Sequence, residues 1–154
     1  MKKRVTIPFG VIIIVFIVIQ FIPAKLPKNS SDPNKEIIQF QYADEKVMTI
    51  LKTSCYDCHS NQTVYRWYAH VAPVSWLIAH DVSEGRETLN FSEWNTYEKR
   101  NLVRKLGDIK EEISKKDMPM SIYTVIHPNA KLSQTQMTLI NDWTDQLTQK
   151  IMGQ

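Results

Sequence analysis

Apolar residues recur at intervals of three and four along most of the chain beyond residue 45, which is the spacing of one face of an α-helix. The stripes consist of Val47, Ile50 and Leu51, with Ser54 at the next position of the same spacing; Val74, Leu77, Ile78 and Val82; Leu102, Leu106, Ile109 and Ile113; and Met137, Ile140, Trp143, Leu147 and Ile151. No segment shows the alternation of apolar and polar residues that is typical of a half-buried strand. The pattern therefore predicts an all-α fold.

Residues that favour helix ends lie close to these stripes. Asp44 can cap the first helix, because its carboxylate can accept hydrogen bonds from the unpaired amides of the first turn. Pro73 suits the start of the second helix, where an amide has no intrahelical partner to lose. Ser133 and Gln136 form a capping-box pattern before the last helix. Glu84-Gly85-Arg86 is interpreted as the end of the second helix or as a bend in it.

The N-terminus has a different pattern. Lys2, Lys3 and Arg4 precede a stretch from Val5 to Ile22 that carries no charge. This run lies at the lower limit for a helix that spans a bilayer, which takes about 17–25 residues. We expect residues 1–23 to form a transmembrane anchor; a cleaved signal peptide is the alternative. Under the positive-inside rule, the rest of the chain would lie on the periplasmic side of a bacterial inner membrane.

Proline and polar residues predict a linker at 24–34, followed by one folded domain at 35–154. The chain of 154 residues carries a net charge of +3, but residues 33–154 contain 14 basic and 15 acidic residues. Such a domain lacks the dense basic face that nucleic acid binding requires. Nucleic acid is therefore not expected as a partner.

The segment Cys55-Tyr56-Asp57-Cys58-His59 has the spacing C-x-x-C-H, which is the attachment signature for a c-type haem. Residues three and four apart on a helical turn share a face, so both thiols can reach the vinyl groups of one haem and form thioether bonds. The imidazole of His59 follows directly and can bind the iron. The motif predicts one covalent haem c, held by Cys55, Cys58 and His59.

Three other kinds of site can contain a C-x-x-C pair. A dithiol redox pair is expected near a βαβ pattern, and none is visible in this chain. A structural zinc site needs two further Cys or His ligands at suitable spacing, but the chain has only two Cys, and its other histidines form no H-x3-5-H pair. A plain disulfide is the third alternative. The histidine directly after the second cysteine favours haem, because these alternatives do not use it.

The sixth position on the iron decides between functions. Met118 is the preferred ligand, because Pro119 disfavours helix at the residue before it and places the thioether in an extended loop. A thioether suits the iron of an electron-transfer haem. Both methionines near Pro119 can instead fill gaps in the core. The other candidate ligands are Met120, His127, His80 and His70.

Aromatic and basic residues follow the haem motif. The aromatic residues are expected to wall the haem pocket; they are Tyr65, Trp67, Tyr68 and Trp76. Arg66 and Arg86 are candidate partners for the haem propionates, since guanidinium pairs well with carboxylate. Ordinary solvated arginines are an equally good interpretation of both.

An ordered series of motifs resembles the small bacterial haem-binding domain family, a branch of the c-type cytochromes. The series consists of Cys55–Asn61, Trp67-Tyr68, Ala72–Leu77, Leu89–Trp94, Met118-Pro119, Tyr123, His127-Pro128, Ala130–Ser133 and Trp143. The resemblance covers about residues 40–146. It implies a small cytochrome c-like helical domain with a single covalent haem, and it supports Met118 as the distal ligand. One departure is Arg66, which stands where a proline is expected.

These observations predict a membrane-anchored mono-haem cytochrome with His59 and Met118 as axial ligands. It would be an electron carrier rather than an enzyme, and its partners would be the membrane and redox proteins. The alternative is a haem-based gas sensor or a peroxidase-like protein with an open sixth position. A peroxidase also needs acid–base groups over the open face of the haem, for which His70 or His80 could be recruited.

Overall fold

The computed structural model describes residues 3–30, 32–37 and 42–153, with side chains from residue 9. Within this part of the chain the regular elements are helices and no strand occurs, which confirms the predicted all-α class. The α-helices are α1 (Lys3–Ile19), α2 (Glu45–Ser54), α3 (Tyr56–His59), α4 (Val74–Thr88), α5 (Lys99–Lys115), α6 (Ser121–Ile126) and α7 (Gln134–Met152). The 3₁₀ helices are η1 (Pro33–Lys35), η3 (Trp67–His70), η4 (Phe91–Thr96) and η5 (Pro128–Ala130).

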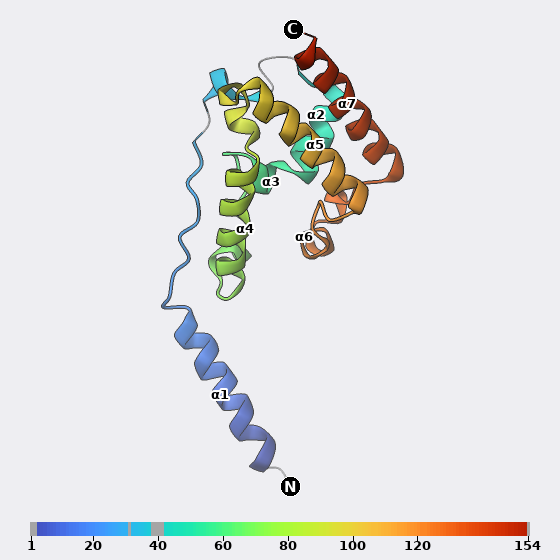
Figure 1. Ribbon diagram of the computed structural model, residues 1–154. Coiled ribbons are helices and arrows are strands. Elements are labelled where there is room, and N and C mark those ends of the chain that lie inside the picture. Colours follow the sequence, from blue (N-terminus) through green and yellow to red (C-terminus); the bar gives the residue numbers. More distant parts are fainter. Residues whose placement is uncertain (1–2, 31, 38–41, 154) are drawn as a thin grey trace.

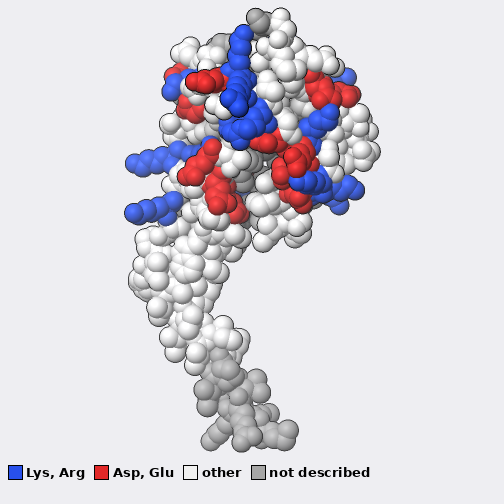
Figure 2. All heavy atoms as spheres, in the orientation of Figure 1, with Lys and Arg blue, Asp and Glu red and all other residues white. Residues whose placement is uncertain are grey.

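The helices from α2 onward pack into one domain, from which α1 projects (Figure 1). The long helices α5 and α7 lie side by side, and α2 packs against α7. The short helix α3 contacts both α2 and α4, so the C-x-x-C-H motif lies where these helices meet. On the face shown in Figure 2, acidic and basic side chains are interspersed over the domain.

The core combines the predicted stripes with an aromatic cluster from η4. Ile140, Trp143, Leu147 and Ile151 of α7 are buried as predicted, and Leu106 and Ile113 of α5 face them. Aromatic rings continue the core toward α3. Tyr56 stacks on Phe91 with 5.5 Å between ring centroids, and Phe91 stacks on Trp94 at 5.8 Å. The motif therefore rests on a rigid aromatic layer.

The predicted helix starts are confirmed. The carboxylate of Asp44 accepts a hydrogen bond of 2.8 Å from the amide of Val47 at the start of α2. Ser133 and Gln136 form a complete capping box before α7. The predicted end or bend at Glu84–Arg86 is wrong, because α4 continues through these residues to Thr88.

The structure corrects the predicted N-terminal anchor. Among the described residues, no helix combines the length and apolar character that a bilayer span requires. α1 has 17 residues and ends at Ile19, so at 1.5 Å per residue it is about 25 Å long, against about 30 Å of hydrocarbon. The predicted location, single-pass in the inner membrane with the haem domain on the periplasmic side, is contradicted by this finding.

The segment between α1 and η1 is hydrogen-bonded to the domain and runs beside α4 (Figure 1). The side-chain amide of Gln20 exchanges two bonds of 3.0 Å with the backbone of Ala72. Further along, Asn29 makes the same reciprocal arrangement with the backbone of Thr63, at 2.8 and 3.2 Å. Arg86 donates to the carbonyl oxygen of Lys28 at 2.8 Å. The segment predicted as a linker is thus held along the surface of the domain.

Candidate functional site

The two thiols and the imidazole of the C-x-x-C-H motif lie on one helical turn. Cys55 joins the end of α2 to α3, and its amide donates to the carbonyl oxygen of Leu51 at 2.9 Å. Its own carbonyl oxygen accepts from the amides of Cys58, at 3.2 Å, and His59, at 2.9 Å. These backbone bonds hold the three residues on one turn, where residues three and four apart share a face.

The ring of His59 is oriented by two carbonyl groups at the C-terminal end of α4. Its Nδ1 lies 2.9 Å from the oxygen of Gly85 and 3.1 Å from the oxygen of Leu89. Because a carbonyl only accepts, Nδ1 carries the proton and Nε2 keeps its lone pair. Burial lowers the pKa of His59, although the bonds to both carbonyls act in the opposite direction. The lowered pKa favours the neutral imidazole, whose Nε2 can bind a metal.

Gly85 allows α4 to approach the motif closely. A Cβ atom at this position would lie 2.7 Å from the carbonyl oxygen of Cys58 and 3.2 Å from its Cβ. Only a residue without a side chain permits that contact. The glycine that sequence reasoning interpreted as a helix end is thus a packing position, and it brings its own carbonyl to His59.

Two adjoining cavities beside the motif form the main cleft. The larger has a volume of about 350 Å³ and the smaller about 150 Å³, and Cys55, His59 and Met118 line both. Cys58 lines the smaller cavity. Apolar side chains form much of the wall of the larger one; they are Leu51, Leu89, Phe91, Ile109, Ile113 and Leu132. The cleft thus joins an apolar enclosure to two thiols, an imidazole and a thioether.

Both cysteines are free thiols in this environment. Burial and the neighbouring Cys58 raise the pKa of the Cys55 thiol to about 12. Burial, Asp57 and Asp81 raise the pKa of the Cys58 thiol to about 11, against the opposing charge of Arg86. A redox dithiol needs a thiolate, and its environment lowers the pKa. The raised values count against the dithiol alternative.

The structure separates the five candidates for the sixth ligand. Met118 lines both cavities of the main cleft, whereas Met120 lines only the smaller one. His127 does not line the cleft. Its Nδ1 donates to the carbonyl oxygen of Tyr123 at 3.1 Å. His70 and His80 are both exposed, and neither lines the cleft. Met118 is therefore the candidate that shares the most wall with His59.

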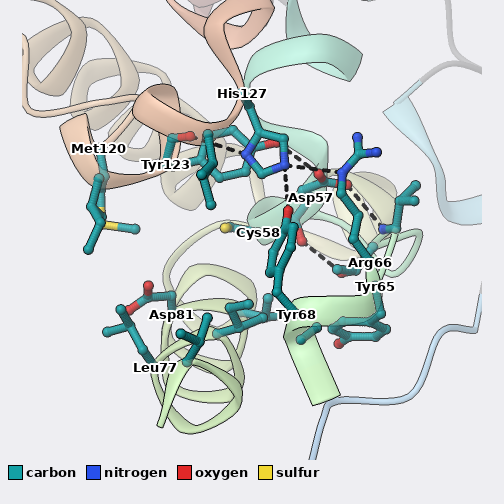
Figure 3. A pocket seen from close by; sticks show the side chains of 18 of the residues that line it. Asp57, Cys58, Tyr65, Arg66, Tyr68, Leu77, Asp81, Met120, Tyr123 and His127 are labelled. Carbon is teal, nitrogen blue, oxygen red and sulfur yellow. Dashed lines mark hydrogen bonds between the residues drawn. The ribbon is translucent and has the colours of Figure 1, made fainter. Parts of the chain in front are cut away.

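A further cavity of about 270 Å³, the outer cavity, lies beyond Cys58 (Figure 3). At one end the hydroxyl of Tyr123 donates to Asp57 at 2.8 Å, and the hydroxyl of Tyr68 donates to Nε2 of His127 at 2.7 Å. Exposed apolar side chains form its rim; they are Val64, Val74, Leu77, Ile122, Val125 and Ile126. The polar network holds α6 against the motif, and the side chain of Cys58 borders both the outer cavity and the main cleft.

The predicted wall and propionate partners lie away from the main cleft. Tyr65 and Tyr68 line the outer cavity, and Trp67 is 78% exposed. The indole of Trp76 donates to the carbonyl oxygen of Ile22 at 2.9 Å. Arg66 binds His127, and Arg86 binds Lys28, Asn29 and Thr63.

Sequence reasoning missed Lys105, which lines the larger cavity of the main cleft. The signal that could have found it is a lysine on the apolar face of α5, three residues after Leu102 and four before Ile109.

The all-helical fold places an apolar cleft beside the C-x-x-C-H turn. A model of the haem-binding domain family matches residues 14–146. The match covers most of the chain, and the protein belongs to this family. The searches of curated proteins and of solved structures gave no match.

The donor set of the main cleft fits a haem. A neutral imidazole with a free Nε2, two thiols on the same turn and apolar walls are the groups that a covalently attached haem uses. His59 and Met118 could bind the iron, and Cys55 and Cys58 could bind the porphyrin edge.

Proposed function

We propose that the protein is a mono-haem c-type cytochrome that carries electrons between redox proteins and is not itself an enzyme. The observation that carries the proposal is the main cleft, where Cys55, His59 and Met118 line the same cavities. Bound haem supplies an iron that changes between the ferric and ferrous states. The protein contributes the attachment, both axial ligands and the apolar surroundings.

The residues around His59 favour a site that changes little between the two redox states. Its Nδ1–H is held by two carbonyl oxygens, so the ring has one orientation. The loop that carries Met118 is tied to α5, because the amides of Asp117 and Met118 both donate to the carbonyl oxygen of Glu112, at 3.0 and 3.3 Å. Two fixed ligands are what an electron carrier needs, and a methionine ligand raises the reduction potential relative to bis-histidine ligation.

Electrons need a short path from the site to the surface. Cys58 borders both the main cleft and the outer cavity, whose apolar rim is open to solvent. Cys58, which would hold the haem, therefore lies close to the surface. This arrangement supports exchange of electrons with another protein.

The test is to produce the chain together with a cytochrome maturation system and then to denature it. We expect the colour to stay with the polypeptide, and the mass to increase by one haem. The double variant Cys55→Ser/Cys58→Ser is the control and should release its colour on denaturation. A wild-type protein that stayed colourless, or that released its haem, would contradict covalent attachment.

Carbon monoxide separates the carrier from the sensor or peroxidase alternative. A ferrous iron with Met118 in place has no vacant position, so we expect slow or no binding of carbon monoxide by the wild-type protein. Rapid binding would show an open sixth position and would favour the ligand-binding alternative.

A further inference from the structure

Lys105 places a positive charge in the wall of the main cleft. Its side chain lies on α5 and is only 6% exposed, yet it lines the same cavity as Cys55, His59 and Met118. The ammonium group donates one hydrogen bond to the carbonyl oxygen of Thr88. It also lies over the ring of Tyr97, 4.5 Å from the centroid. An ammonium has three N–H donors, so these two partners leave donor capacity that faces no acceptor among the described side chains.

The charge of Lys105 has no anionic partner in this structure. Among the ion pairs formed by described residues, none involves Lys105. The negative charge of Asp108 raises the pKa of Lys105 and so opposes the effect of burial. Asp108 pairs, however, with Arg104, at 3.7 Å. Burial lowers the pKa of Lys105, because the charged form loses its hydration. Buried charges in proteins are normally paired, so the missing anion is expected to come from a ligand.

The other charges around the cleft make Lys105 the place for an anion. Of the described residues that line the two cavities, Lys105 is the only lysine or arginine. The remaining charged residues of the walls are acids, and they would repel a carboxylate; they are Asp57, Asp81, Glu84, Asp108, Glu111 and Glu112. Among the described residues of these walls, Lys105 is therefore the one counter-ion for a ligand with carboxylate groups.

We propose that Lys105 binds a propionate carboxylate of the haem and thereby sets how the porphyrin lies in the main cleft. The inference rests on the proposed function, because it places the haem between His59 and Met118. Attachment at Cys55 and Cys58 orients the vinyl edge, and the propionates belong to the opposite edge. Lys105 lies on α5, outside the motif, and provides the charge that this opposite edge requires.

The competing role for Lys105 is structural. Thr88 is the last residue of α4, and a lysine at its carbonyl oxygen caps that helix and complements its dipole. A cap of this kind would stabilise the protein with or without ligand, and it would not distinguish a carboxylate from its ester. That difference provides the test.

The experiment is a thermodynamic cycle that compares the affinities of two porphyrins for two proteins. Apo-protein is titrated with mesohaemin, whose vinyl groups are reduced so that no thioether can form, and with mesohaemin dimethyl ester, whose carboxylates are blocked. The proteins are the wild type and Lys105→Met, which keeps an unbranched side chain of similar length and loses the charge. Lys105→Arg is the matched control, because it keeps the charge.

We expect the wild type to prefer mesohaemin over the ester by about tenfold more than Lys105→Met does, which is the range of a charge-assisted hydrogen bond. Lys105→Arg should retain most of the preference. An equal ratio of the two affinities in all three proteins would overturn the proposal and leave the helix cap as the role of Lys105. A wild type that bound neither porphyrin would overturn it as well.

A second variant and a second readout keep the test decisive. If Lys105→Met does not fold, Lys105→Gln removes the charge and keeps a hydrogen-bond donor. The cycle uses porphyrins that cannot attach, so a failure of covalent attachment would contradict the proposed cytochrome without changing the measured ratio. Conversely, if haem attaches covalently but the protein binds mesohaemin and its ester with the same affinity ratio in every variant, only the role of Lys105 is overturned.

Discussion

The imidazole Nδ1 of His59 lies 2.9 Å from the carbonyl oxygen of Gly85, a residue 26 positions further along the chain. The same glycine lets α4 pack against the backbone of Cys58. One position therefore performs two tasks: its missing side chain allows the approach, and its carbonyl orients the proposed iron ligand. The packing of α4 on α3 and the geometry of the metal-binding ring are coupled through it.

Gly85→Ala should destabilise the protein. The added Cβ would meet the carbonyl oxygen of Cys58 at 2.7 Å, which forces α4 away from α3. We expect the free energy of unfolding in urea to decrease by about 1–3 kcal/mol, the usual cost of overpacking. The matched control is Gly107→Ala on α5, where a Cβ meets nothing within 4 Å. This substitution should raise the free energy of unfolding by about 1 kcal/mol, because alanine has the higher helix propensity. Equal stabilisation by both substitutions would contradict the close-packing role.

Met118→Ala should open the iron of the matured protein. Met118 shares both cavities of the main cleft with His59, so the substitution would remove the proposed sulfur ligand. The ferric protein should lose its sulfur-to-iron absorption band, and the ferrous protein should bind carbon monoxide. Met120→Ala is the control, because Met120 lines the outer cavity and only the smaller cavity of the main cleft, and it should keep both properties. The reverse pattern would assign the ligand to Met120.

The thiols of the apo-protein should react slowly with iodoacetamide. Burial raises the pKa of Cys58 from 9.0 to about 11 and that of Cys55 to about 12. Because only the thiolate reacts, a rise of two units lowers the thiolate fraction of Cys58 at pH 8 by about 100-fold. The greater nucleophilicity of a thiolate with a higher pKa offsets part of this decrease. Alkylation followed by mass spectrometry should be slower in buffer than in urea, and it should accelerate as the pH approaches 11. Faster reaction of the folded protein would revive the dithiol alternative.

Arg86→Met should expose the segment before η1 to proteolysis. The guanidinium of Arg86 donates to the carbonyl oxygen of Lys28, which is the group that trypsin attacks. It also donates to Asn29 and Thr63. We expect cleavage after Lys28 to become several-fold faster in limited digestion.

The control for that digestion is Arg104→Met, which likewise removes one trypsin site. Arg104 is exposed and pairs with Asp108 on its own helix, away from this segment. It should leave the cleavage rate after Lys28 unchanged. Equal rates in both variants would show that Arg86 does not hold the segment.

Local sequence signals predicted the elements and the attachment motif. Asp44 and Ser133 cap their helices because each side chain bonds an amide only three residues away. The stripe of α7 is buried because its spacing follows the helical repeat. Cys55, Cys58 and His59 share a turn for the same reason. Such features depend on residues within four positions of each other, so a single sequence contains them.

The tertiary structure alone decided which side chains surround the main cleft. Gly85 is 27 residues from Cys58, and nothing nearby in the sequence shows that the two backbones touch. The predicted arginines and aromatics lie elsewhere for the same reason, and Lys105 reaches the cleft only because α5 packs across it. The predicted anchor was wrong, since no described helix is long and apolar enough to span a bilayer. The helix α1 ends at Ile19, and the side chain of the next residue, Gln20, bonds to the backbone of Ala72. Contacts between distant segments depend on how the helices pack, which the spacing of residues along the chain does not encode.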